Sequence, residues 1–501
     1  MANVTSLLRG ADDDVALRVP GGVSLTYRRV GELVAETAER LASLGVTPGA
    51  RVAMAYPNSP EAIVLFLGAA AVATACPLNP AYTETEFRFY LEDTAAEFLL
   101  LPPDGAPAAR QAVPPTIRLI EAQIAGDGQL RTTNGVSATV PPSATGHASA
   151  DPADDDVALV LHTSGTTSRP KRVPLRHRNL VASVANIVAH YQLTSRDVSL
   201  CIMPLFHVHG LVASALATFA SGGTVVVPET FAPLGFWPIA REVRPTWFSA
   251  SPTPHQLILM RGHDDRPPGT ERLRFVRSCS AALAPALMAS MERRFGVPVL
   301  EAYGMTEASH QMSSNPLPPG QRYPGSVGIG TGVQIAVVDE HGRSLPPGAT
   351  GQVGIRGPNV IDGYENNPEA NAASFANGWF LTGDQGTLDA DGYLRLLGRI
   401  KELINRGGEK IAPREIDEAL EQHPRVKEAV AFGVPHPTWG EDVAAAVVVE
   451  GPVTEKELQA HCRQTLADFK VPRHIYIVEA IPRTPTGKVQ RRFVAEQFSR
   501  K

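Results

Sequence analysis

Residues 157–171 read Val-Ala-Leu-Val-Leu-His-Thr-Ser-Gly-Thr-Thr-Ser-Arg-Pro-Lys. The first five residues form an apolar run that is typical of a buried strand. A loop with five hydroxyl side chains, one glycine and a final lysine follows this run. Hydroxyl and backbone N–H groups bind phosphate oxygens, glycine lets the backbone approach closely, and lysine adds positive charge. The stretch therefore predicts a phosphate-binding loop at the end of a strand.

This loop differs from a Walker loop. The Walker motif places serine or threonine directly after its lysine, whereas Arg172 follows Lys171 here. A polar surface turn between two strands is the alternative interpretation of the same residues. The sequence of this segment alone does not distinguish a phosphate-binding loop from a surface turn, so the other loops of the chain have to be considered.

Composition limits the classes of protein to consider. The 501 residues are enough for about two or three domains. A hydrophobic content of 43% with 19% charged residues is typical of a soluble globular protein. Because the net charge is −5, no basic face is implied, and we expect no nucleic-acid partner.

Three further features favour a cytoplasmic protein without a membrane span. Residues 1–14 lack the profile of a signal peptide, and the last four residues are not a peroxisomal address. Two long uncharged runs, 62–83 and 198–228, contain prolines and other interrupting residues, so we expect buried segments there. The four cysteines lie far apart and predict neither a disulfide framework nor a zinc site: Cys76, Cys201, Cys279 and Cys462.

Strand patterns alternate with helical stretches beyond residue 156. The strands are expected at 157–161, 198–203, 224–227, 246–250, 274–278 and 297–303. This rhythm predicts a largely parallel sheet covered on both faces, in which ligands bind beyond the carboxyl ends of the strands. Four polar motifs follow these strands: Thr163–Lys171, His207–Gly210, Ser278–Ala282 and Tyr303–Glu307. We expect the four loops at one edge of one sheet, where together they form a site.

The remaining segments complete an α/β chain of several domains. A helix is expected at 27–44 and a strand at 51–56, and residues 102–156 suggest a long, partly disordered surface excursion. Short strands and glycine turns beyond residue 324 predict a β-rich subdomain. The last hundred residues predict a compact α+β unit with helices at 413–423 and 455–466 and strands at 426–434 and 444–449. We expect a large N-terminal domain over 1–398, a hinge at 399–401 and a small C-terminal domain over 402–501.

Five motifs closely resemble those of the adenylate-forming acyl-CoA synthetase family, also called AMP-binding enzymes. They occur in the family's order: Thr163–Lys171, Tyr303–Glu307, Thr382–Asp384, Gly398–Ile404 and Pro482–Lys488. Within that family the chain looks most like oxalate–CoA ligases, on residues 162–170, 203–210, 305–310 and 405–410. The resemblance implies the adenylate-forming enzyme fold, with a mobile C-terminal domain.

The resemblance also implies a two-step reaction of a small carboxylate with ATP, Mg²⁺ and coenzyme A. The carboxylate attacks the α-phosphate of ATP to give an acyl-adenylate and pyrophosphate. The C-terminal domain then rotates, and the thiol of coenzyme A displaces AMP. No oligomeric state is implied.

Several residues receive nucleotide-binding roles from the resemblance. Those expected at the β- and γ-phosphates are Thr163, Ser164, Gly165, Thr166, Thr167 and Lys171. Those expected along the adenine and ribose are Ser280, Ala281, Ala282, Tyr303, Gly304, Asp384 and Arg399. Thr306 is expected to bond the α-phosphate, and Glu307 to bind Mg²⁺, which prefers carboxylate and phosphate oxygens. Lys401 falls at the hinge and Gly408 at the pantetheine tunnel.

Lys488 carries the strongest catalytic expectation from the resemblance. Negative charge concentrates between the carboxylate and the α-phosphate in the first step, and a positioned ammonium group stabilises it. Without the family context, Lys488 is equally well an exposed lysine after a Thr-Gly turn.

The pocket for the acid is expected to be polar. Its candidate residues are His207, His209, Ser280, Ser309 and His310, with His255 as a further candidate. A second carboxylate buried beside the reactive one needs hydrogen-bond donors, whereas a fatty chain would leave such groups unpaired. Each histidine also has a simpler interpretation: His207 or His209 gates the site, and His255 caps a helix. A medium- or long-chain fatty acid–CoA ligase and a catalytically weak nucleotide-binding relative are the alternatives.

One residue departs from the family pattern. The family usually has glycine after the lysine of the phosphate loop, and this chain has Arg172. Arginine adopts positive φ only at a cost. The loop is therefore expected either to sit differently or to gain a further phosphate contact.

Overall fold

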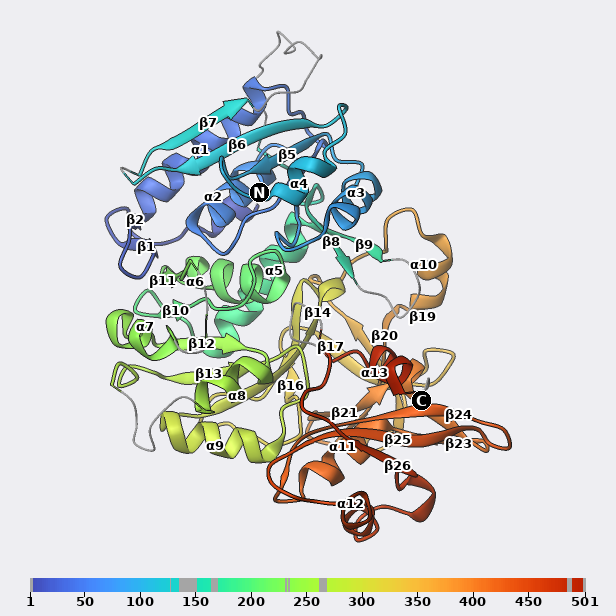
Figure 1. The fold of residues 1–501 in the computed structure, drawn as a ribbon. Helices are drawn as coiled ribbons and strands as arrows, with labels where there is room; N and C mark the ends of the chain where they lie inside the picture. Colours follow the sequence, from blue (N-terminus) through green and yellow to red (C-terminus); the bar gives the residue numbers. More distant parts are fainter. Residues whose placement is uncertain are drawn as a thin grey trace.

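The structure is a computed structural model. It describes residues 3–126, 128–134, 151–163, 170–229, 232, 235–260, 268–483 and 489–498. The chain is of the α/β class, as predicted, and its strands form four sheets (Figure 1).

The first sheet has seven strands in the order β7-β6-β5-β3-β4-β8-β9. The strands are β3 (Arg51–Met54), β4 (Thr74–Pro77), β5 (Phe98–Leu101), β6 (Arg118–Ile124), β7 (Leu130–Asn134), β8 (Val157–Thr163) and β9 (Lys171–Arg176). Its inner strands are parallel, and β7 and β9 join the two edges antiparallel.

The prediction of a surface excursion over residues 102–156 is wrong for the first part of that segment that the structure describes. Residues 102–134 contain α4 (Pro107–Ala112) and the strands β6 and β7. Ile120 and Ala122 of β6 are buried in the core. The proline- and alanine-rich flanks of this segment obscured the short alternating pattern of the strand. Residues 135–150 lie outside the described part.

The second sheet has nine strands in the order β16-β15-β14-β13-β12-β10-β11-β1-β2. They are β1 (Val15–Arg18), β2 (Ser24–Thr26), β10 (Val198–Leu200), β11 (Thr224–Val226), β12 (Trp247–Ala250), β13 (Phe275–Ser278), β14 (Val299–Met305), β15 (His310–Ser314) and β16 (Ile329–Gly330). The parallel run from β1 to β14 confirms the predicted parallel sheet.

The prediction that all four polar loops meet at one sheet is wrong. Three of them follow strands of the second sheet, whereas the Thr163–Lys171 segment joins β8 to β9 of the first sheet. Hydrophobic periodicity identifies strands but not their neighbours, so it cannot divide strands between two sheets.

Helices cover both sheets and fill the space between them. They are α1 (Tyr27–Ser43), α2 (Pro60–Ala70), α3 (Glu84–Asp93), α5 (His177–Tyr191), α6 (Ala217–Ala220), α7 (Phe236–Val243), α8 (Pro252–Met260) and α9 (Pro285–Phe295). The predicted helix at 27–44 is confirmed: the Thr26 side chain caps its first turn, and its apolar face is buried. Helix α5 lies between the two sheets (Figure 1), and one hydrophobic core contains residues of both.

The third sheet is antiparallel and matches the predicted β-rich region. It consists of β17 (Gln334–Val338), β18 (Thr350–Arg356), β19 (Phe375–Ala376), β20 (Trp379–Leu388) and β21 (Leu394–Arg399). Helix α10 (Pro368–Ser374) precedes β19. The cross-strand pairing of β20 with β21 sets Asp384 opposite Arg399.

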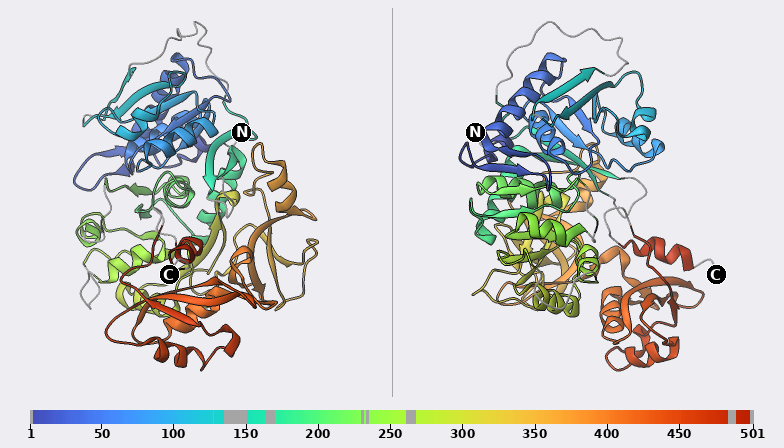
Figure 2. Two further views of the ribbon diagram at one scale, coloured as in Figure 1. Left: turned by 45° about the vertical axis from the view of Figure 1, so that its right-hand side comes forward. Right: turned by 60° about the vertical axis from the view of Figure 1, so that its left-hand side comes forward.

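The fourth sheet has its own hydrophobic core at the end of the chain. Its strands are β22 (Ile404–Arg406), β23 (Glu409–Ile411), β24 (Val426–His436), β25 (Gly440–Val449) and β26 (His474–Ile477). The helices α11 (Pro413–Glu421), α12 (Glu455–Cys462) and α13 (Arg491–Phe498) accompany it. In Figure 2 this orange and red part stands beside the rest of the chain. The Arg483 side chain reaches across and donates to Thr253 Oγ1 of α8 at 2.6 Å.

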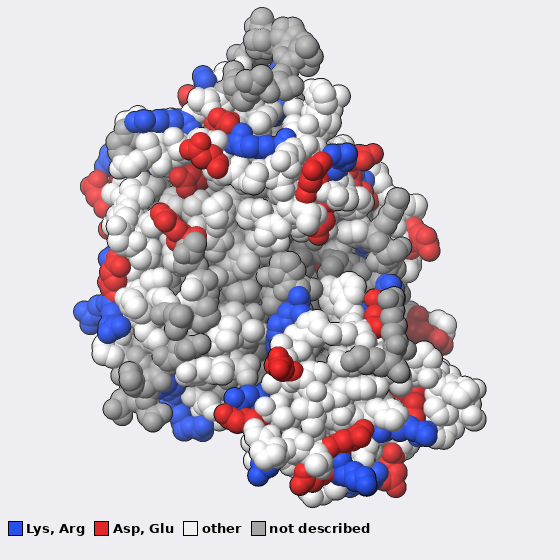
Figure 3. Space-filling model, in the orientation of Figure 1, with Lys and Arg blue, Asp and Glu red and all other residues white. Residues whose placement is uncertain are grey.

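Charges of both signs are scattered over the face shown in Figure 3. Among the described residues, no helix is both long and apolar enough to cross a membrane.

Candidate active site

Tyr303, Asp384 and Arg399 form one cluster between the second and third sheets, in which Tyr303 and Asp384 are buried and Arg399 is exposed. Tyr303 lies on β14, and its hydroxyl donates to Asp384 Oδ2. The Arg399 Nε lies 2.7 Å from Asp384 Oδ1. Burial, and then the charge of Asp384, raise the pKa of Tyr303 well above its usual value, so the phenol remains a donor. The two donors hold the Asp384 carboxylate in one orientation, and the structure thus unites three residues that are far apart in sequence.

Glu307 belongs to a second cluster that adjoins the first. It lies on η4 (Thr306–Ala308) directly after β14, and both Thr306 and Glu307 are buried. The Tyr364 hydroxyl donates to Glu307 Oε1 at 2.8 Å. The Lys171 Nζ lies 4.3 Å from the centre of the Tyr364 ring. Burial lowers the pKa of Lys171, as does the charge of Lys401, while Glu307 opposes the shift. A carboxylate thus lies beside the cationic end of the predicted phosphate loop.

The structure describes the two residues at the ends of the predicted phosphate loop, Thr163 and Lys171. Thr163 and Lys171 are cross-strand neighbours on β8 and β9. Ser164, Gly165, Thr166 and Thr167 lie outside the described residues. The structure therefore places the base of the loop beside Glu307 and Tyr364.

Arg172 lies on β9, just after the predicted phosphate loop. Arg172 is not among the residues with positive φ. Its guanidinium lies 3.5 Å from Glu365 Oε2 and donates to the backbone carbonyl of Asp93. On the neighbouring strand β8, His162 Nε2 lies 2.9 Å from Oδ2 of the same Asp93, the last residue of α3. Arg172 therefore braces the hairpin against Glu365 and Asp93.

The candidate acid pocket contains His209, Ser280 and His310. His209 Nδ1 lies 3.0 Å from Ser280 Oγ, and the centres of the His209 and His310 rings are 5.0 Å apart. His209 begins η2 (His209–Leu216), a π-helix, and such helices are frequent at functional sites. The residues come from the start of η2, the loop after β13 and the start of β15, so the structure brings together predicted residues that are a hundred positions apart.

Backbone strain is concentrated in this pocket. Nine non-glycine residues in the described part have positive φ, and three of them are pocket residues: Ser280, Ser309 and His310. Such conformations are costly for L-residues and cluster at active sites. Gly304 permits the close approach, because a Cβ there would collide with the His310 carbonyl oxygen. Gly304, next to Tyr303, thus brings the backbone of β14 into close contact with His310.

The remaining predicted pocket residues make other contacts. The Ser309 hydroxyl is buried and donates to the Asn359 carbonyl at 2.9 Å. The His207 Nδ1 accepts from the backbone N–H of His209 at 3.2 Å. His255 lies on the opposite face of the sheet against Phe248, and its Nε2 lies 3.1 Å from the carbonyl oxygen of Arg277. Burial lowers the pKa of His255 to about 4, so its ring is neutral at physiological pH.

Further predicted residues lie at the edges of the site. Ala281 and Ala282 are exposed just after Ser280. Lys401 lies on η5 (Ile400–Glu402), between β21 and β22. Gly408 lies between β22 and β23 and has a φ of +97°. A residue with a side chain would be strained at this φ, although the space around Gly408 is open. Lys488 lies outside the described residues, although its flanking residues Arg483 and Val489 form an antiparallel bridge.

The sequence pattern did not identify three residues of the site. Tyr364 contacts both Glu307 and Lys171, and Ser249 and Arg277 contact His209. Arg277 could have been identified from the sequence, because it is a charged residue inside the mostly apolar strand β13. Tyr364 and Ser249 had none, since a tyrosine in a loop and a serine in a strand are common.

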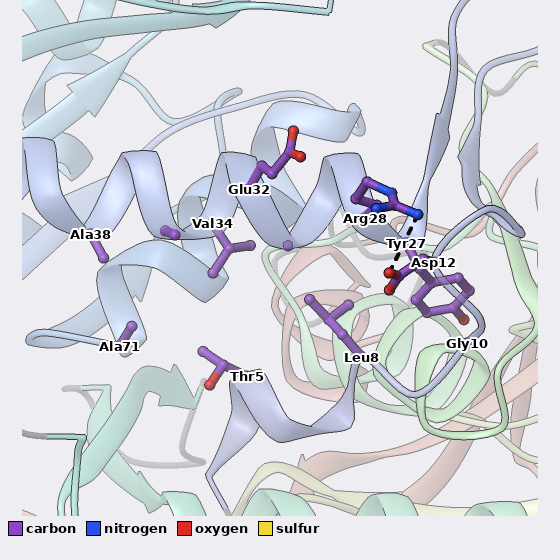
Figure 4. Close-up of a pocket in the computed structure, with 12 residues that line it drawn as sticks. Thr5, Leu8, Gly10, Asp12, Tyr27, Arg28, Glu32, Val34, Ala38 and Ala71 are labelled. Atoms are coloured by element: carbon purple, nitrogen blue, oxygen red, sulfur yellow. Dashed lines mark ion pairs between the residues drawn. The ribbon is translucent and has the colours of Figure 1, made fainter.

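A hollow of about 520 Å³ lies away from these clusters, between η1 (Val4–Leu7) and α1. Figure 4 shows Thr5, Leu8, Tyr27 and Val34 around it, with the ion pair between Asp12 and Arg28 at its rim. It contains none of the predicted site residues.

Two family matches cover most of the chain. The AMP-binding enzyme family matches residues 7–365, and its C-terminal domain matches residues 415–488. An oxalate–CoA ligase of Arabidopsis thaliana is 48% identical, over 98% of this chain and 96% of the relative. An oxalate–CoA ligase of Saccharomyces cerevisiae is 44% identical, over 90% and 87% respectively.

The solved structures agree with these matches. ATP-bound MatB from Rhodopseudomonas palustris has a TM-score of 0.89 and 32% identity, and the alignment covers 99% of both chains. The sequence motifs, the clustered site and these similarities agree, and the chain belongs to the AMP-binding enzyme family of acyl-CoA ligases.

Proposed function

We propose that this protein is an oxalate–CoA ligase, which converts oxalate, ATP and coenzyme A to oxalyl-CoA, AMP and pyrophosphate. The observation that carries the acid assignment is the polar network of the buried His209 and His310 with the half-buried Ser280. A dicarboxylate can accept hydrogen bonds from such groups, whereas an alkyl chain would leave them unpaired. The two relatives named as oxalate–CoA ligases support the same substrate.

Adenylation brings one carboxylate oxygen to the α-phosphorus while pyrophosphate leaves. In this proposal, Asp384 and Arg399 bind the ribose hydroxyls, and Ser280–Ala282 with Tyr303 and Gly304 line the adenine. Thr306 donates to the α-phosphate. Thr163, Lys171 and the residues between them hold the β- and γ-phosphates, so the pyrophosphate leaves from a positively charged environment.

Glu307 would hold a magnesium ion, because its buried carboxylate is a ligand that this cation prefers. Mg²⁺ usually takes one or two carboxylates together with phosphate oxygens and water. The described residues include no group of three metal-binding side chains, so Glu307 would share the ion with the phosphates. When bound, Mg²⁺ neutralises developing phosphate charge. Tyr364 orients the Glu307 carboxylate from behind, and Lys171 balances its charge.

The C-terminal part would supply the catalytic lysine. We infer a large domain over 1–398, a hinge at 399–401 that includes Lys401, and a mobile domain over 402–501. Arg483, which pairs with Val489 in an antiparallel bridge, contacts Thr253 of the large domain. This contact supports the adenylation orientation. In the second step the rotated domain would present Gly408 to the pantetheine of coenzyme A.

The cysteines support a reducing compartment. All four are buried and unpaired, which fits the cytoplasm.

ATP–pyrophosphate exchange with oxalate, malonate, acetate and octanoate tests the proposed function. We expect the fastest exchange with oxalate. Exchange with octanoate alone would transfer the assignment to fatty acids. No exchange with any acid would favour a nucleotide-binding protein without ligase activity.

A further inference from the structure

Arg277 is a completely buried charge beside the acid pocket. It lies on β13, with its side chain fully removed from solvent. Within the described residues, no carboxylate lies within 4 Å of its guanidinium, whereas the buried carboxylates of Asp384 and Glu307 each have a positive charge nearby. Burying an uncompensated charge is expensive. The guanidinium therefore needs an explanation in terms of what it contacts.

Its contacts are all neutral, and they hold the guanidinium on three sides. Nε donates to the Tyr191 hydroxyl at 2.9 Å, and Nη2 donates to Gln311 Oε1 at 3.0 Å. Nη1 donates to Ser249 Oγ at 2.9 Å and faces His209 Nε2 at 3.3 Å. Nη2 also faces His310 Nδ1 at 3.3 Å. One arginine thus contacts both pocket histidines.

The donor-only character of arginine decides the protonation of these rings. A guanidinium cannot accept a hydrogen bond, so the nitrogens facing it, His209 Nε2 and His310 Nδ1, must be acceptors. The neutral His209 then carries its proton on Nδ1, and the neutral His310 carries its proton on Nε2.

The direction of the next hydrogen bonds follows from these tautomers. Ser249 accepts from Arg277, so its own proton points to His209 Nε2, 2.6 Å away. His209 Nδ1–H donates to Ser280 Oγ at 3.0 Å. In the described part of the chain, His209 is the sole hydrogen-bond partner of the Ser280 hydroxyl. The Ser280 proton is therefore directed away from His209. Without Arg277, the same chain could reverse, and Ser280 would donate inward.

We propose that Arg277 is a positioning residue that determines substrate selectivity. It orients the chain Arg277–Ser249–His209–Ser280 and the pair Arg277–His310 so that Ser280 Oγ–H and His310 Nε2–H act as donors. Two donors suit a carboxylate, which only accepts. The pocket thereby selects an acid that carries a second anionic group beside its reacting carboxylate. This inference rests on the proposed function, because it explains how that site prefers oxalate.

Oxamate provides the discriminating substrate. It replaces one carboxylate of oxalate by an uncharged carboxamide of nearly the same shape, whose N–H groups oppose the donors of the pocket. A merely structural Arg277 would affect oxalate and oxamate equally. If Arg277 fixes the direction of the hydrogen bonds, its replacement would lower kcat/KM for oxalate more than for oxamate.

The test measures kcat/KM for oxalate and for oxamate by ATP–pyrophosphate exchange in the full-length protein. Arg277→Lys keeps the charge but loses the forked geometry. We expect oxalate kcat/KM to fall about 100-fold, and the oxalate-to-oxamate ratio to fall at least about tenfold, as for lost hydrogen bonds to a charged group. The KM for ATP should change little. An unchanged ratio in a folded variant overturns the inference.

Ser249→Ala keeps the test decisive if Arg277→Lys fails to fold, because it removes only one hydroxyl. We expect it to lower the same ratio by about three- to tenfold. Ser199→Ala is the matched control, since Ser199 is also buried on a neighbouring strand but lies outside the chain of contacts. An unchanged ratio in Ser249→Ala overturns the inference. If the wild type shows no exchange with oxalate, the proposed function itself fails.

Discussion

Replacing Asp384 by asparagine is expected to weaken ATP binding while the fold survives. The carboxylate lies between the Tyr303 hydroxyl and the Arg399 guanidinium, and it is 6% exposed. Asparagine has the same shape but carries an NH₂ group where the carboxylate has an acceptor. With its oxygen toward Arg399, which only donates, asparagine directs this NH₂ group at the Tyr303 hydroxyl, which then has to accept instead of donate.

The magnitude follows from the hydrogen bonds that change. A hydrogen bond to a charged group contributes about 1.5–3 kcal/mol. The amide oxygen still accepts from one ribose hydroxyl, so the loss for ATP is about one such bond. That corresponds to a rise in the KM for ATP of about tenfold to 150-fold. The ion pair with Arg399 adds little to stability, because the Arg399 side chain is 46% exposed and solvent screens the pair.

The assay is ATP–pyrophosphate exchange at saturating oxalate with ATP varied. Asp389→Asn is the matched control, because Asp389 lies in the turn of the same hairpin, is exposed, and accepts only from the backbone of that turn. A KM for ATP within about twofold of the wild type in Asp384→Asn, with the protein folded, would refute the assignment of Asp384 to the ribose.

Three further changes test other parts of the site and the fold. Lys488→Ala should slow exchange about 10²- to 10³-fold with little change in the KM for ATP, because the ammonium group acts on the transition state. Tyr364→Phe should raise the Mg²⁺ concentration for half-maximal exchange about 10- to 100-fold, because it removes the donor that orients Glu307 but keeps the ring under Lys171. Glu301→Gln should stabilise the protein above pH 7: burial raises the pKa of Glu301 from 4.5 to about 7, so the folded wild type loses stability as pH rises from about 4.5 to 7. The gain should approach about 3 kcal/mol in urea unfolding at pH 8 and vanish below about pH 4.5.

Each of these changes has a control and an outcome that contradicts it. Lys456→Ala alters an exposed lysine of α12 and should leave exchange unchanged, and an equal loss in both lysine variants would remove the special role of Lys488. Tyr393→Phe removes an exposed tyrosine hydroxyl bonded to a backbone carbonyl and should not alter the Mg²⁺ requirement. For Glu301→Gln, the same stability difference at pH 4.5 and pH 8 would show that proton binding is not its cause.

Contiguous motifs were predictable because their chemistry is local. The phosphate loop, the Tyr303–Glu307 turn and Asp384 each combine a strand with polar residues within a few positions, so the pattern points to them directly. The strands of the parallel sheet and the elements after residue 404 were also predictable, because alternating and helical periodicities depend only on near neighbours. The amino-acid sequence by itself thus determined the family motifs, the α/β class and the kinds of chemical group at the site.

The tertiary structure decided which of these groups meet and in which direction they donate. The phosphate loop lies on a different sheet from the other polar loops, a division that no periodicity contains. Ser249, Arg277, His209 and His310 come from four separate elements and contact one another only through the register of β12 with β13 and the turn into β15. Hydrogen-bond direction depends on distances of about 3 Å between such distant residues, and only the folded chain sets those distances.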